Sequence, residues 1–63
     1  DAAGVQTIRD RDGLELAGAD LRRGERSAAL TAPSAPGSYT VRVTMQRGVG
    51  LETLVRPLRL SGR

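Results

Sequence analysis

The clearest pattern along the chain is a strict alternation of apolar and polar residues between positions 39 and 46. The apolar members are Tyr39, Val41, Val43 and Met45. Successive side chains of a strand point to opposite faces, so this alternation predicts a strand with one buried face and one wet face. We therefore expect Val41 and Val43 to be buried. We expect Arg42 and Thr44 to face solvent or a polar interface.

The N-terminal part of the chain predicts a β-hairpin. Residues 5–10 form a first expected strand, and Asp12-Gly13 then supplies a strong hairpin turn signal. Residues 14–17 form a short second strand. Residues 18–25 are predicted to be a polar connection from which Leu21 reaches the core.

Two further strands complete the prediction. Residues 26–31 indicate a third strand that is weakened by its alanines, and residues 32–37 form a proline-rich loop. After the strand around positions 39–45, the glycines of residues 48–50 predict a tight turn. Residues 51–60 then form a long fifth strand.

The fifth strand contains a proline where its apolar pattern changes phase. Apolar residues at positions 51 and 55 have one parity, whereas those at 58 and 60 have the other, and Pro57 lies between the two sets. A proline within a strand belongs on an edge or at a bulge, and a bulge shifts the exposed face by one residue. We expect an edge strand with a bulge or a change of sheet at Arg56-Pro57.

Short strands separated by regular turn signals predict an all-β fold, a small immunoglobulin-like sandwich of about five strands. The chain of 63 residues has no Phe, Trp or Cys and a single Tyr. Such a chain can build only a thin core without disulfides. We expect residues 1–63 to be one module, a piece of a longer protein, that needs another chain or a neighbouring domain to be complete; the alternative is an unusually economical aliphatic sandwich.

The sequence offers no recognisable catalytic or metal-binding motif. It contains no His and no Cys, so a nucleophile and its base would have to come from Ser, Tyr and carboxylates. Asp10, Asp12 and Glu15 cluster where the hairpin turn is expected, which indicates a solvated tip. Asp10-x-Asp12-Gly13 matches only the start of a calcium loop, and Gly48-x-Gly50 lacks the rest of a phosphate loop. We predict no enzyme, no cofactor and no site residues.

The net charge of +3 comes from ten arginines and no lysine, with a sequence pI of about 11.1. Arginine-only usage beside many alanines and glycines suggests a GC-rich bacterial genome. A small basic OB-like or SH3-like barrel that binds nucleic acid or another polyanion is therefore an alternative fold and function. Its best cluster would be Arg22, Arg23 and Arg26. Stacking platforms need aromatics, however, and Tyr39 is the only one, so nucleic acid is not the favoured partner.

Several short motifs together resemble a known class of module. They are Val5-x-x-Ile8-x-Asp10-x-Asp12-Gly13-x-x-Leu16, Leu21-x-x-Gly24, Leu30-x-Ala32-Pro33 and Pro36-Gly37-x-Tyr39-x-Val41-x-Val43. This series is similar to bacterial immunoglobulin-like and macroglobulin-like β-sandwich modules. Thr53-Leu54-Val55 also resembles a segment of the immunoglobulin-like region of the flagellar hook-capping protein, although that family's aromatic-Asp-Gly signature is missing.

The resemblance implies a non-catalytic structural or interaction module of a larger bacterial protein or assembly. It implies an extracytoplasmic location, which is periplasmic, cell-surface or secreted, and partners that are other protein chains or neighbouring domains. No stretch of the sequence is long and apolar enough to predict a membrane span.

Overall fold

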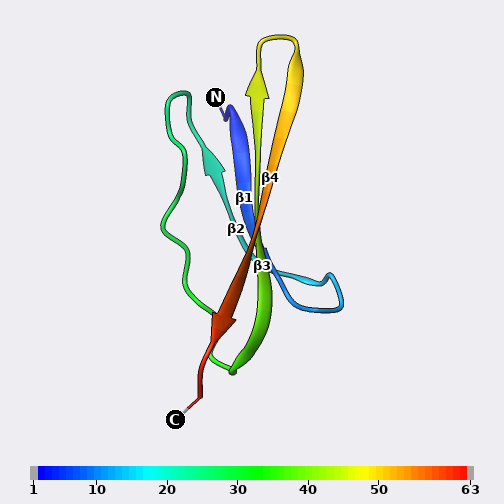
Figure 1. Ribbon diagram of the computed structural model, residues 1–63. Coiled ribbons are helices and arrows are strands. Elements are labelled where there is room, and N and C mark those ends of the chain that lie inside the picture. Colours follow the sequence, from blue (N-terminus) through cyan, green and yellow to red (C-terminus); the bar gives the residue numbers. More distant parts are fainter. Residues whose placement is uncertain (1, 63) are drawn as a thin grey trace.

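The computed structural model describes residues 2–62 and shows an all-β chain with one antiparallel sheet. The strands are β1 (Gly4–Arg9), β2 (Glu15–Leu21), β3 (Gly37–Arg47) and β4 (Gly50–Leu60), in the order β2-β1-β3-β4 (Figure 1). The sheet is twisted (Figure 1), and the molecule is elongated, with extents of 43 × 18 × 15 Å. Across residues 2–62 there is no helix with the length and apolar character needed to cross a membrane.

Both predicted hairpin turns are confirmed. The turn between β1 and β2 is closed by hydrogen bonds from the Gly13 amide to the Asp10 carbonyl and from the Asp10 amide to the Leu14 carbonyl, both 3.0 Å long. The turn between β3 and β4 has only two residues, and Gly48 there has a φ of 59°. Glycine suits this position because residues with a side chain rarely adopt a positive φ.

Strand pairing defines which side chains share a face, because residues directly opposite in an antiparallel pair point the same way. Ile8 lies opposite Ala17 and Val41, and Gln6 lies opposite Ala19 and Val43. We call this the apolar face. Its larger apolar residues are Ile8, Leu21, Tyr39, Val41, Val43, Met45, Leu54, Leu58 and Leu60. The opposite face carries mainly threonine, arginine and acidic residues.

The core of the apolar face is thin. Ile8 is 4% exposed and Leu21 is fully buried, and these are the buried apolar residues of the described chain. The placement of Leu21 in the core is as predicted. Val41 and Val43 share the apolar face as expected but are only half-buried, because the layer above them is a loop. Arg42 is exposed as predicted.

Thr44 faces a polar neighbour as predicted, although it is half-buried. Its neighbours in the sheet are Val5 of β1 and Thr53 of β4, and the Thr44 and Thr53 hydroxyls lie 3.4 Å apart. β3 is flanked on both sides, and Thr40 and Thr44 are partly covered, whereas the longer Arg42 and Gln46 side chains stay exposed.

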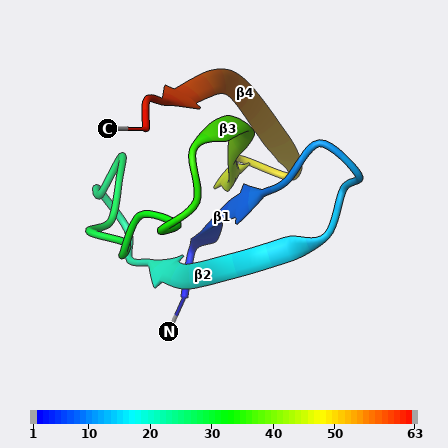
Figure 2. The same cartoon turned by 90° about the horizontal axis from the view of Figure 1, so that it is seen from below.

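The layer above the apolar face is the connection 22–36, which follows one side of the sheet (Figure 2). The Gln6 side chain binds both backbone groups of Ala28: its Nε2 donates to the carbonyl at 3.1 Å, and its Oε1 accepts from the amide at 2.8 Å. The Tyr39 hydroxyl donates to the Ala35 carbonyl at 2.6 Å. Side chains from two strands therefore tie this connection down.

The prediction of a strand at residues 26–31 is wrong, since this segment pairs with no strand within residues 2–62. The Gln6 carboxamide supplies the donor and acceptor that a neighbouring strand would offer to Ala28. The segment that was predicted to be a connection, residues 18–25, is instead partly strand, because β2 continues to Leu21.

The predicted bulge at Arg56-Pro57 is also wrong. The β3–β4 register runs without interruption from Gly37 opposite Leu60 to Arg47 opposite Gly50, with Pro57 opposite Thr40. The irregularity of the sheet lies elsewhere: the β1–β2 register shifts between Ile8 and Arg9, which makes Leu16 the extra residue of β2. β4 keeps its phase because apolar residues occupy both of its faces.

Candidate functional site

The acidic residues of the first hairpin serve the turn itself. Asp10 Oδ1 accepts hydrogen bonds from the backbone amides of Asp12 and Leu14, both 2.9 Å long. Glu15 Oε1 lies 3.5 Å from the Arg9 guanidinium, which also donates to the Gly13 carbonyl at 3.2 Å. This arrangement fits the predicted solvated hairpin tip. No group of three or more potential metal ligands occurs within residues 2–62.

An open cleft of about 720 Å³ lies beside this tip. It is bordered by residues 10–12 and by the start of β3 and the end of β4, including Tyr39 and Arg59. Acidic and basic side chains alternate around it. The Asp10 carboxylate is already engaged by backbone amides, so the cleft presents no concentrated charge for a ligand.

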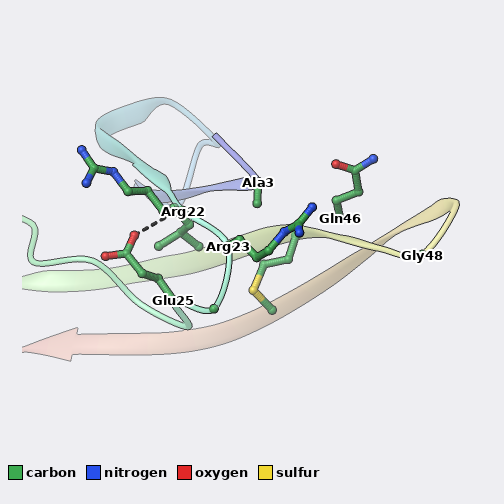
Figure 3. A pocket seen from close by; sticks show the side chains of 9 residues that line it. Ala3, Arg22, Arg23, Glu25, Gln46 and Gly48 are labelled. Carbon is green, nitrogen blue, oxygen red and sulfur yellow. Dashed lines mark hydrogen bonds between the residues drawn. The ribbon is translucent and has the colours of Figure 1, made fainter. Parts of the chain in front are cut away.

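A second cleft of about 390 Å³ lies between the start of the 22–36 connection and the end of β3 (Figure 3). It contains Arg22 and Arg23 of the predicted basic cluster. The Arg22 amide donates to Glu25 Oε1 at 2.7 Å, and the Glu25 amide donates to the Arg22 carbonyl at 3.0 Å. These bonds close a turn in which Gly24 has a φ of 91°.

The two arginines of this cleft do not converge. Figure 3 shows the Arg22 and Arg23 side chains extending away from each other, with the Glu25 carboxylate beside the backbone of Arg22. All three residues are exposed. Anion sites concentrate several donors on one point, and this cleft does not.

The two edges of the sheet differ in how well they are protected. β2, at one edge, is seven residues long, carries the bulge at Leu16 and contains Gly18 and Asp20. Short length, a bulge and a charge are the features that keep an edge from pairing with other strands. β4, at the other edge, is eleven residues long and its pairing with β3 has no irregularity.

β4 also exposes large apolar side chains. The exposed fractions are 75% for Leu51, 44% for Leu54 and 56% for Val55. Leu54 lies on the apolar face and the other two lie on the opposite face. A long, regular edge with apolar residues on both sides is a surface that favours pairing with another strand.

Sequence reasoning found this edge only in part. Pro57 correctly indicated an edge strand, since β4 is the last strand of the sheet. The sequence did not predict the exposure of Leu51 and Val55. A bulge at Pro57 would have placed most of the apolar residues of this strand on one face, whereas they occupy both faces. Comparisons of this chain with models of protein families, with curated proteins and with solved structures found no match.

Proposed function

We propose that this chain is a non-catalytic structural or interaction module whose sheet is completed by another protein chain or by a neighbouring domain. The observation that carries this proposal is the contrast between core and surface. Among residues 2–62 two apolar side chains are buried, Ile8 and Leu21, while β4 leaves Leu51, Leu54 and Val55 exposed on a free edge. Small β units need additional strands or a covering layer for independent stability.

The partner layer would turn the single sheet into a sandwich. An immunoglobulin-like sandwich packs two sheets face to face, and the single sheet of residues 2–62 would be one of the two. The sequence resemblance to bacterial immunoglobulin-like modules supports this assembly. The same resemblance supports an extracytoplasmic place in a larger bacterial protein or assembly.

Circular dichroism combined with analytical ultracentrifugation on the 63-residue chain tests the proposal. We expect no cooperative thermal transition in dilute solution, and ordered β structure only where the chain associates or is joined to its partner. A chain that unfolds cooperatively as a dilute monomer would overturn the proposal, because its sheet would then need no completion.

A further inference from the structure

The direction of the backbone amides shows which residues of β4 face the free edge. The Gln46 amide donates to the Ala3 carbonyl at 2.9 Å, on the β1 side of β3. Amides alternate in direction along a strand, so the odd-numbered residues of β3 face β4. Their partners in β4 are even-numbered, from Gly50 to Leu60. The residues whose backbone groups face outward are therefore Leu51, Thr53, Val55, Pro57 and Arg59.

This alternation explains how β4 tolerates its proline and also limits the usable edge. Pro57 has no amide hydrogen, but at an outward position β3 loses no hydrogen bond. The outward donors run from Leu51 to Val55 and stop at Pro57, while the β3–β4 turn ends the strand on the other side. The segment 51–57 is thus the continuous free edge, and Leu54 is its midpoint.

We propose that a second copy of this chain pairs antiparallel along β4, with Leu54 opposite Leu54 of the second copy. This inference rests on the proposed function and names the chain that extends the sheet along its free edge, rather than a layer that packs on its face. Thr53 and Val55 then exchange hydrogen bonds with Val55 and Thr53 of the second copy. The Leu51 amide donates to the Pro57 carbonyl of the second copy, and because Pro57 has no amide hydrogen, this outermost pair makes one hydrogen bond instead of two. Such strand addition is a common mode of β-sheet association.

Charge favours this register, because the nearest alternatives, centred on Thr53 or on Val55, place Glu52 or Arg56 opposite Leu54 and form no opposite-charge pair. With Leu54 at the centre, Glu52 lies opposite Arg56 of the second copy, and two-fold symmetry repeats the pair. Opposite charges in a directly opposed pair stabilise a sheet, whereas like charges destabilise it. A shift that makes Thr53 and Leu51 partners places Glu52 opposite Glu52. A shift that makes Val55 and Pro57 partners places Arg56 opposite Arg56.

The paired edge would also cover apolar surface. Leu54, 44% exposed in the single chain, would meet its own copy on the apolar face. Val55, 56% exposed, would lie beside Thr53 of the second copy on the other face. The combined sheet would end on β2 at both sides, the strand that the bulge at Leu16 protects. An interface of one strand pair is small, so we expect a weak dimer that depends on concentration.

Cysteine cross-linking tests the register directly, because the native chain contains no cysteine. In the proposed dimer Leu54 and its copy form a non-hydrogen-bonded pair with Cα atoms about 4.5 Å apart, within the range of a disulfide. We expect Leu54→Cys to form a covalent dimer under mild oxidation. Leu51→Cys is the matched control, since its two copies would lie roughly 20 Å apart. Equal cross-linking of both variants would overturn the register.

Charge exchange provides a second test that needs no covalent bond. Arg56→Glu would place two carboxylates opposite each other at both symmetric pairs, and we expect dimerisation measured by sedimentation to weaken at least about tenfold. Arg59→Glu makes the same change of charge outside the paired segment and should leave the dimer unchanged. The double variant Glu52→Arg/Arg56→Glu should restore part of the dimerisation, although it also removes the ion pair between Glu52 and Arg47 of the same chain. Dimerisation that weakens equally in Arg56→Glu and Arg59→Glu contradicts the proposal. A double variant that dimerises no better than Arg56→Glu also contradicts it.

These outcomes separate the inference from the proposed function. A chain that associates as it folds, but without cross-linking at Leu54 and without a response at Arg56, would overturn pairing through β4 and leave the interaction module standing. A chain that remains unfolded at every concentration would also overturn pairing through β4 and leave the interaction module standing, because its partner would then be a different protein. A folded dilute monomer with no association would overturn both.

Discussion

At the scale of single residues, Gly4 determines how closely β1 and β3 approach each other. Gly4 lies opposite Met45, and a Cβ atom built on it would collide with the Thr44 carbonyl oxygen. The colliding atom belongs to the backbone of a central strand and cannot move aside as a flexible side chain would. The absence of a side chain at position 4 is thus a packing requirement of the sheet.

We expect Gly4→Ala to destabilise the folded chain by roughly 1–3 kcal/mol, the usual cost of overpacking. Thermal unfolding followed by circular dichroism, at one fixed concentration where the chain is folded, measures the change. Gly50→Ala is the matched control, because nothing lies within 4 Å of a Cβ atom at that strand position. A melting temperature lowered equally by both substitutions would show that the approach at Gly4 is not the cause.

The hydroxyl oxygen of Thr7 is buried without a hydrogen bond to any of the described residues. Its side chain is 6% exposed. A buried unsatisfied hydroxyl costs free energy, and an apolar group of similar shape removes that cost. We expect Thr7→Val to raise the free energy of unfolding by about 1 kcal/mol. Thr31→Val, at an exposed loop position, should change it little; chemical denaturation of both variants would show whether burial makes the difference.

At the scale of elements, Gln6 links β1 to the 22–36 connection. Its carboxamide is 8% exposed and satisfies both backbone groups of Ala28. In Gln6→Glu the carboxylate would face the Ala28 carbonyl in place of a donor. We expect a loss of roughly 1–3 kcal/mol and faster hydrogen exchange at the Ala28 amide. Gln46→Glu makes the same change at an exposed position and serves as the control. Hydrogen exchange at Ala28 that is the same in both variants would rule out this link.

The same element shows where prediction from sequence succeeded and failed. Alternation at residues 39–46 and the Asp12-Gly13 turn are local signals, and both led to correct elements. Residues 26–31 lack such a signal, since alanine fits many conformations. Their state depends on Gln6, which is 22 positions from Ala28 in the sequence and close only after folding. Long-range hydrogen bonds of this kind cannot be inferred from one sequence.

The free edge of β4, like the fold, could be predicted from the sequence only in part. Pro57 indicated an edge strand because a central position would cost a ladder hydrogen bond, and β4 is indeed at the edge. The false bulge arose from the assumption that β4 has a single apolar face. Leu51 and Val55 lie on one face and Leu54 on the other, so the change of phase comes from exposed apolar residues on both faces.

At the scale of the whole molecule, the positive charge is dispersed over an elongated sheet. Arg9 and Arg47 are paired with Glu15 and Glu52 at 3.5 and 3.1 Å. Arg42 lies on one face, while Arg56 lies on the other. A polyanion is attracted to a continuous basic stripe or cleft. The described chain spreads its arginines over both faces, the hairpin tip and the 22–36 connection, and so it lacks a focused positive surface.

This distribution predicts how the chain will respond to nucleic acid. We expect only weak association, the same for unrelated DNA sequences, because scattered arginines can neutralise phosphates but cannot read bases. Binding should fall steeply as salt rises from about 50 mM to 200 mM. Fluorescence anisotropy with two duplexes of different sequence measures both properties. Arg22→Gln and Arg42→Gln should weaken the residual binding to similar extents, since neither belongs to a dedicated site. Tight binding that distinguishes the two duplexes at physiological salt would instead favour a basic nucleic-acid-binding module, and it would require the arginines to gather on one surface in the complex.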